Sequence, residues 1–351
     1  LEPITINRMI LRNRMIVSAM VTGYANLDGS ASEKYIAYHE AKAKGGWGLI
    51  ITEDYIINPT AGASAPLPAL YDDCQIESHS KLTKRVHDAG GMIAAQLYHA
   101  GRETSSAVTG EQPVAPSAII DPTMPEQPRA LTTEEIENLE DQFAAAALRA
   151  KKAGFDAIEI HGAHGYLVNQ FVSPFSNKRT DSYGGSLRNR ARFALNIVAK
   201  TRALVGPDYP IIYRMSAQEY VEGGLALEEA KAFAQMLEEA GVDMIHCSQG
   251  VYGSIAAVVP PFGVTRGAFV ENAAAIKSVV SIPVSAVGRI NDPDLAEAIL
   301  ASGKADLVTM ARASLADPEL PNKVREERYD DISRCIGCLQ GCLANSNAGT
   351  G

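Results

Sequence analysis

Short apolar segments rich in Val and Ile alternate with longer segments of helical periodicity along most of the chain. This alternation is typical of repeated strand–helix units and a parallel sheet. Eight such units over roughly 300 residues meet the requirement of an α/β fold of the (β/α)8 TIM-barrel type, and a doubly wound open sheet is the alternative. The expected strands cover residues 15–20, 48–53, 92–97, 157–162, 211–216, 244–249, 283–288 and 307–312.

Other segments complete the expected architecture. The N-terminal stretch ITINRMILRNRM predicts a small hairpin that plugs the bottom of the barrel. Thr132 and Glu135 form a capping box at the start of the helix before the fourth strand, and Gly154 ends that helix. The stretch from Ser105 to Arg129 carries five prolines and predicts an excursion over the top of the barrel.

Charge and hydropathy exclude several classes of partner. A net charge of −9 disfavours nucleic acid, because phosphate backbones require clustered Lys and Arg. We find no apolar run of about 18 residues and no signal peptide in the opening LEPITIN, so no membrane span is predicted. Cys74 and Cys247 stand alone, unlike a disulfide framework, and we expect a reducing cytoplasm. The expected partner is a small-molecule substrate, and a homo-oligomer is left open.

Polar residues at the end of the fourth strand predict the active site, because barrels build their sites where strands end. In the segment AIEIH, Glu159 and His161 point inward if the isoleucines point outward. Glu159 is equally well interpreted as a member of a buried network. His161, His164 and Tyr166 of HGAHGY converge on one mouth, where the histidines can hold a substrate oxygen and the tyrosine can supply a proton. Zinc is a weaker alternative, because no acidic or cysteine ligand lies close by in sequence.

The ends of the seventh and eighth strands predict a phosphate site. Gly288 and Arg289 follow one strand, and Ala311 and Arg312 follow the other. TIM barrels commonly hold phosphate at this position, where backbone amides approach the group and a guanidinium supplies charge.

Two inward side chains suit the ring of a phosphorylated cofactor that reaches the barrel centre. Gln96 can both donate and accept, which matches a ring amide. Arg214 would place a fixed positive charge beside a reduced flavin. The alternative for both residues is a core network with Glu159.

The stretch EIHGAHGYLVNQFVSPFSNKRTDSYGGSLRNRARF, residues 159–193, resembles the signature of the old yellow enzyme family of flavin oxidoreductases. The segments GGWGLIITE, AQLYHAGR, YRMS and VGRI extend this resemblance over the barrel. The resemblance implies FMN as cofactor, His161 and His164 as contacts of the activating oxygen of the substrate, and Tyr166 as proton donor after hydride transfer. The implied phosphate contacts are Gly288, Arg289, Ala311 and Arg312. The implied flavin contacts are Ser18, Met20, Thr52, Gln96 and Arg214.

Three cysteines near the end of the chain indicate which branch of this family the chain resembles. The segment ARASLADPELPNKVREERYDDISRCIGCLQGC is similar to the branch containing 2,4-dienoyl-CoA reductase and trimethylamine dehydrogenase, in which a [4Fe–4S] cluster follows the barrel. Cys335, Cys338 and Cys342 match three ligands, and the fourth position falls just beyond Gly351. Zinc would require a second CxxC motif. We expect an FMN-binding barrel over residues 1–330 and a truncated cluster segment over 331–351, which in this branch precedes FAD- and NAD-binding domains.

Three functions follow from these patterns. The favoured one is an FMN-dependent ene reductase that reduces an α,β-unsaturated carbonyl compound with electrons from NAD(P)H through the cluster. A C–N bond (amine) dehydrogenase would favour an aromatic cage, and the single tryptophan, Trp47, gives it little support. The third is a flavin electron-transfer module without its own substrate. Two departures separate the chain from dienoyl-CoA reductases: the histidine pair of HGAHGY, and Tyr252 where that branch has a histidine.

Overall fold

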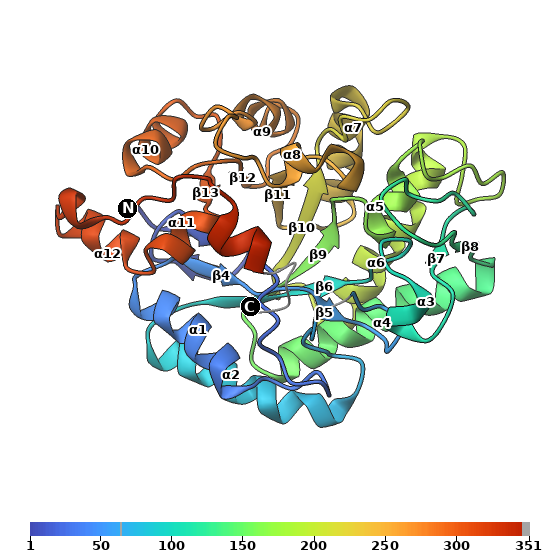
Figure 1. Ribbon diagram of the computed structural model, residues 1–351, viewed down its shortest axis with the longest axis horizontal. Helices are drawn as coiled ribbons and strands as arrows, with labels where there is room; N and C mark the ends of the chain where they lie inside the picture. The colour runs from blue at the N-terminus through green and yellow to red at the C-terminus, as the bar shows by residue number, and fades with distance from the viewer. Residues whose placement is uncertain (64, 346–351) are drawn as a thin grey trace.

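The computed structural model describes residues 1–63 and 65–345. Within them, eight parallel strands follow the ring order β4-β3-β13-β12-β11-β10-β9-β6, and the pairing of β4 with β6 closes the barrel. Figure 1 shows the long helices arranged around these strands. The TIM-barrel prediction is confirmed and the open-sheet alternative is wrong. The barrel strands are β3 Met15–Val17, β4 Leu49–Ile51, β6 Ile93–Tyr98, β9 Ala157–Gly162, β10 Ile211–Ser216, β11 Met244–Ser248, β12 Val284–Ala286 and β13 Leu307–Thr309.

The remaining elements form the outer layer and the loops. The longer helices are α1 Glu33–Lys44, α2 Ile76–Asp88, α4 Thr133–Lys152, α6 Leu187–Val205, α7 Leu227–Glu239, α9 Val270–Lys277 and α10 Pro293–Ala301. The short helices are α3 Ser106–Thr109, α5 Leu167–Val172, α8 Ile255–Val258, α11 Ala311–Ala316 and α12 Leu320–Arg325. The additional strands are β1 Ile4–Ile6, β2 Met9–Leu11, β5 Tyr55–Ile56, β7 Val114–Ala115 and β8 Arg129–Ala130. No helix in the described part of the chain has both the length and the apolar character needed to cross a bilayer.

Local signals fix the ends of α4 as the sequence predicts. The Thr132 hydroxyl accepts a hydrogen bond from the Glu135 amide at 3.2 Å, and the Glu135 carboxylate accepts one from the Thr132 amide at 2.8 Å. These two bonds satisfy amides that have no partner inside the helix. Gly154 follows the last turn with φ of +87°, a conformation that glycine adopts without steric cost.

The N-terminal hairpin closes one end of the barrel. Strands β1 and β2 pair antiparallel, with Ile4 opposite Leu11. Ile6, Met9 and Leu11 pack in one cluster with interior side chains of the barrel strands, which confirms the predicted plug. The interior members of that cluster are Ile16, Leu49, Ile51, Ala94, Ala157, Ile212, Met244 and Leu307.

Truncating the plug is expected to cost stability. Leu11 is 0% exposed, whereas its neighbour Ile10 is 63% exposed. Leu11→Ala should lower the free energy of unfolding by about 2–5 kcal/mol, because it leaves a cavity at the barrel end. Ile10→Ala is the matched control and should change stability by about 0.5 kcal/mol or less. Urea denaturation measures both variants, and equal losses would show that the hairpin does not seal a packed core.

The proline-rich excursion is anchored above β6. It contains α3 and β7, and β7 pairs with β8 in parallel. The guanidinium of Arg102, close after β6, lies 3.3 Å from the carboxylates of both Glu103 and Asp121, and all three side chains are almost fully buried. This ion-pair network therefore attaches the excursion to the end of the barrel where the strands finish.

Candidate active site

A buried polar layer crosses the barrel interior above the apolar plug. Glu159 accepts a hydrogen bond from Gln96 Nε2 at 2.6 Å and pairs with His246 Nδ1 at 2.8 Å. Burial lowers the pKa of His246, so a neutral imidazole donates from Nδ1. The core-network interpretation therefore holds for Glu159 and for one end of Gln96. The other end of Gln96, Oε1, and the other ring nitrogen of His246 have no partner.

The next layer holds a buried cation. Arg214 on β10 is opposite His161 on β9 and His246 on β11 in the strand register. Its side chain forms no ion pair within 4.0 Å among the described residues, and its Nε has no hydrogen-bond partner. Such an unsatisfied buried donor is costly unless a ligand or water pairs with it. The charges that act on Arg214 come from Glu159 in the layer below and from Asp54 and Tyr166 at the mouth, so Arg214 lies between the two.

Two imidazoles stand at the end of β9. The rings of His161 and His164 have centroids 5.1 Å apart in an edge-on arrangement. His161 Nδ1 accepts from the Ala163 amide at 3.3 Å, and His164 Nε2 lies 2.7 Å from Ser248 Oγ. Burial, reinforced by Arg214, lowers the pKa of both histidines well below the ordinary value. Both rings are therefore neutral hydrogen-bonding groups, and His161 carries its proton on Nε2.

A wall of tyrosines continues from the histidines. The Tyr166 ring lies 4.8 Å from His161 and 4.6 Å from Tyr98, measured between ring centroids. Its hydroxyl is 3.1 Å from that of Tyr252. Desolvation raises the pKa of Tyr166 well above its ordinary value and that of Tyr252 to about 12. Both phenols are therefore protonated near neutral pH, and Tyr252 contacts the predicted proton donor.

Asp54 is a site residue that the sequence analysis missed. It follows β4 in the segment TEDY, it is 5% exposed, and its Oδ1 lies 3.9 Å from His161 Nε2. Burial raises the pKa of Asp54 to about 7, and the nearby Arg214 opposes this shift. An acidic residue two positions after Thr52 at a strand end was the available signal.

The side chains of the predicted flavin contacts differ in whether their polar atoms already have hydrogen-bond partners within the protein. Ser18, directly after β3, is 1% exposed and its hydroxyl has no partner. Thr52 donates its hydroxyl to the Ala94 carbonyl at 3.1 Å, so its side chain is already satisfied. Met20 packs against the main hydrophobic core. Ser18, Gln96 and Arg214 thus present unsatisfied polar atoms, whereas Thr52 does not.

The predicted phosphate contacts come together only in part. Gly288 has φ of +130°, and a Cβ there would lie 2.8 Å from the Phe269 ring. Arg289 Nη1 donates to the carbonyls of Phe262, at 2.6 Å, and Val264. Its guanidinium is therefore held by the loop between α8 and α9, although its Nε has no partner. Ala311 opens α11.

Arg312, beside Ala311, lies close to the three clustered cysteines. Their thiols raise its pKa, although burial has the larger, lowering effect. Cys335 and Cys342 are half-buried and Cys338 is exposed, and all three are free. Within residues 1–63 and 65–345 no three His, Cys, Asp or Glu side chains gather closely enough to hold a metal. The zinc alternative at the histidines thus has no ligand set. The cysteines as placed do not form a cluster site, and the iron–sulfur assignment stays a prediction.

The unsatisfied atoms of the mouth share one property: each is a buried polar group that needs a partner. A flat polar ring with a phosphate tail supplies donors, acceptors and negative charge of the kind these atoms require. The residues present therefore fit FMN. The buried unpaired atoms include ones of Ser18, Gln96, Tyr98, Arg214, His246, Arg289 and Arg312.

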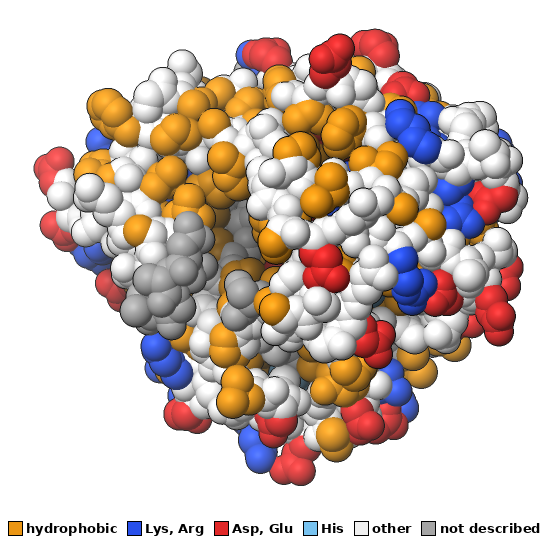
Figure 2. All heavy atoms as spheres, turned by 45° about the vertical axis from the view of Figure 1, so that its right-hand side comes forward, with side chains coloured by type: hydrophobic (Ala, Val, Ile, Leu, Met, Phe, Trp, Pro, Cys, Tyr) orange, Lys and Arg blue, Asp and Glu red, His pale blue; other side chains and the backbone are white. Residues whose placement is uncertain are grey.

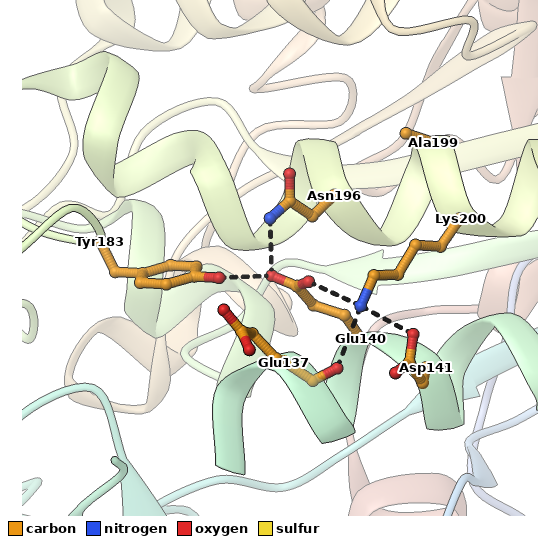
Figure 3. Close-up of a pocket in the computed structure, with 7 residues that line it drawn as sticks. All are labelled: Glu137, Glu140, Asp141, Tyr183, Asn196, Ala199 and Lys200. Carbon is orange, nitrogen blue, oxygen red and sulfur yellow. Dashed lines mark hydrogen bonds and ion pairs between the residues drawn. The ribbon is translucent and has the colours of Figure 1, made fainter. Parts of the chain in front are cut away.

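A second hollow lies outside the barrel and has a structural role. A surface cavity of about 400 Å³ between α4 and α6 is lined by Glu140, Tyr183, Asn196 and Lys200, among others. Figure 3 shows the other three side chains converging on the Glu140 carboxylate, which accepts from Tyr183 at 3.0 Å and Asn196 at 2.9 Å. The oxygens of Glu140 are therefore satisfied by its neighbours in this cavity. The space-filling view in Figure 2 shows a separate, central hollow with hydrophobic side chains, in orange, along much of its border.

Known proteins resemble this chain over most of its length. A family model described as the NADH:flavin oxidoreductase / NADH oxidase family matches residues 1–331. NADH oxidase of Thermoanaerobacter brockii is 46% identical over 340 residues, which are 96% of this chain and 52% of that protein. The chain thus spans about half the length of the first curated relatives it matches.

Two solved structures extend the comparison. A 2-naphthoyl-CoA reductase complex superposes with a TM-score of 0.95 at 31% identity, over 99% of this chain and 55% of that one. An old yellow enzyme homologue from Zymomonas mobilis superposes with a TM-score of 0.80 at 30% identity, over 93% of this chain and 92% of that one.

Proposed function

The chain belongs to the NADH:flavin oxidoreductase / NADH oxidase family, as the old yellow enzyme resemblance predicted, and we propose that it is an FMN-dependent ene reductase. The proposed substrate is an α,β-unsaturated carbonyl compound whose C=C bond is reduced. The proposed electron donor is NADH or NADPH.

One observation carries this proposal: His161, His164 and Tyr166 surround a single mouth as neutral hydrogen-bonding groups. Neutral imidazoles can donate hydrogen bonds to a carbonyl oxygen. These bonds stabilise the negative charge that develops on that oxygen during the reaction. A protonated phenol beside them can deliver a proton to the α-carbon. This pairing of an oxygen site with a proton donor suits reduction of an enone.

The chain's own residues would divide the work as follows. Bound FMN would supply the hydride. Ser18, Gln96 and Arg214 would hold its ring through their unsatisfied polar atoms, and Gly288 and Arg312 would hold its phosphate. The Tyr252 hydroxyl, 3.1 Å from that of Tyr166, would orient the proton that Tyr166 gives up.

Amine oxidation is a second candidate, and one observation favours it. Tyr98, Tyr166 and Tyr252 form an aromatic wall beside the carboxyl of Asp54, an arrangement that can attract an ammonium group. Trp47 has no part in this wall, since it is buried and donates its indole N–H to the Pro318 carbonyl at 2.8 Å. The histidine pair gives no advantage to an amine, so we rank this function second.

The iron–sulfur cluster remains a proposal based on the spacing of Cys335, Cys338 and Cys342. We assign it no step. The third candidate function is a flavin module that only passes electrons to a partner protein. In such a module His161, His164 and Tyr166 would have no catalytic role.

The test is anaerobic reoxidation of the reduced holoenzyme. The purified protein is expected to be yellow, to be bleached by NADH or NADPH, and to regain its colour when an enone is added, with the saturated ketone as product. Recovery without an organic acceptor but with a protein acceptor would support the electron-transfer module instead. Bleaching by an amine alone would support amine oxidation. Iron and acid-labile sulfide analysis of the same sample tests for the cluster. A sample without iron would show that the purified protein holds no cluster.

A further inference from the structure

An unassigned carboxyl group stands beside the proposed oxygen site, and its position bears on which acceptors can bind. We propose that Asp54 is a specificity-determining residue that admits neutral carbonyl acceptors and rejects α,β-unsaturated carboxylates. This inference rests on the proposed ene reductase function, because it concerns the oxygen that His161 would hold.

The distance between the two groups leaves room for one substrate atom. Asp54 Oδ1 and His161 Nε2 are 3.9 Å apart, which is too long for a hydrogen bond between them. Two atoms at that separation can both lie about 2.8 Å from a third atom that sits to one side of the line joining them. Because His161 Nδ1 accepts from the Ala163 amide, the ring proton is on Nε2, the atom that lies 3.9 Å from Asp54. An oxygen that accepts from His161 would therefore also contact Asp54.

The charge of Asp54 decides which oxygen is tolerated there. A protonated Asp54 can donate to a carbonyl oxygen together with His161. An ionised Asp54 repels a second carboxylate strongly, since both charges would be desolvated a few ångströms apart. Burial raises the pKa of Asp54 to about 7, so the ionised fraction grows as the pH rises through neutrality. An unsaturated acid is already ionised throughout this range. Its rejection should therefore strengthen above about pH 7.

The surrounding groups do not cancel this charge. Arg214 is the cation whose field reaches Asp54, but the carboxylate of Glu159 also acts on both groups. Arg214 forms no ion pair with Asp54 within 4.0 Å, and the hydrogen bond that acts on the Asp54 carboxyl comes from its own backbone amide. The other titratable groups that face Asp54 are Glu53, Tyr98, His161, Tyr166 and Tyr252.

The experiment compares cinnamaldehyde with cinnamate, a matched aldehyde and acid. The readout is the ratio of kcat/KM for the acid to that for the aldehyde, so that a general loss of activity cancels. For the wild-type holoenzyme this ratio should be low and should fall further between pH 6 and pH 8. Asp54→Asn keeps a donor and removes the charge, and it should raise the ratio at pH 8 by about tenfold or more while flattening its pH dependence.

A neighbouring carboxylate gives the matched control. Glu53 is also buried, but its carboxylate accepts from Thr22, through the Thr22 amide at 3.1 Å and hydroxyl at 2.6 Å. Glu53→Gln should leave the ratio within about twofold of wild type, well below the change expected for Asp54→Asn. Infrared difference spectra at pH 6 provide a readout without turnover: a protonated carboxyl band should disappear in Asp54→Asn.

Each outcome separates this inference from the function on which it rests. If wild type and variants reduce neither compound, the ene reductase proposal fails. If the aldehyde is reduced but the ratio is the same in wild type and Asp54→Asn, the role of Asp54 is refuted and the proposed function stands. A ratio raised equally in both variants would also refute it, because the effect would then be one of overall charge.

Discussion

Tyr166→Phe is expected to lower kcat for enone reduction by about 10²–10⁴-fold, because it removes the proton donor and nothing else of the ring. The rings of Tyr98 and His161, 4.6 and 4.8 Å from that of Tyr166, would still pack against the phenylalanine. Stopped-flow absorbance separates the two halves of the cycle. Reduction of the enzyme by NAD(P)H should be nearly unchanged, and reoxidation by the enone should carry the loss.

Tyr252→Phe provides the comparison for this variant. It breaks the 3.1 Å contact between the two hydroxyls but keeps the Tyr166 phenol. We expect a smaller loss than in Tyr166→Phe and an altered pH profile of the reoxidation step, since Tyr252 acts through its neighbour. Equal turnover by Tyr166→Phe and wild type would remove Tyr166 from the mechanism.

Glu159→Leu is expected to lower the free energy of unfolding by about 2–5 kcal/mol, because two buried donors lose their acceptor at once. These donors are Gln96 Nε2 at 2.6 Å and His246 Nδ1 at 2.8 Å. The charge of the nearby Arg214 also loses a compensating carboxylate. Chemical denaturation of the protein measures the loss.

An exposed glutamate serves as the reference for that measurement. Glu137→Leu, on the outer face of α4, should change stability by about 0.5 kcal/mol or less. If Glu159→Leu were as stable as wild type, the polar layer would not contribute to the fold. The role of the polar layer would then be limited to binding the cofactor.

The sequence predicted the barrel well because its signals are local. Each strand is a short apolar run, so all eight were found, and the capping box of Thr132 and Glu135 defined a helix start from four residues. The convergence of His161, His164 and Tyr166 was also predictable, since they lie within six residues of one strand end. Local spacing was sufficient wherever one strand or loop supplied the whole feature.

The remainder depended on contacts between distant segments. His246 and Ser248 contact Glu159 and His164 only because β11 lies two places from β9 in the ring. The direction of the Arg289 guanidinium depends on carbonyls more than twenty residues away. Asp54 was overlooked because an acidic residue after a strand is unremarkable until His161 is found opposite it. No periodicity in the chain encodes such pairings.

The hairpin at the foot of the barrel also bears on kinetics. Because β1 and β2 occlude that end, a nicotinamide donor that reduces the proposed flavin directly would share the entrance at the opposite end with the organic acceptor. In that case the two compounds would bind in turn rather than together, and we would expect parallel lines in double-reciprocal plots and inhibition by each compound at high concentration.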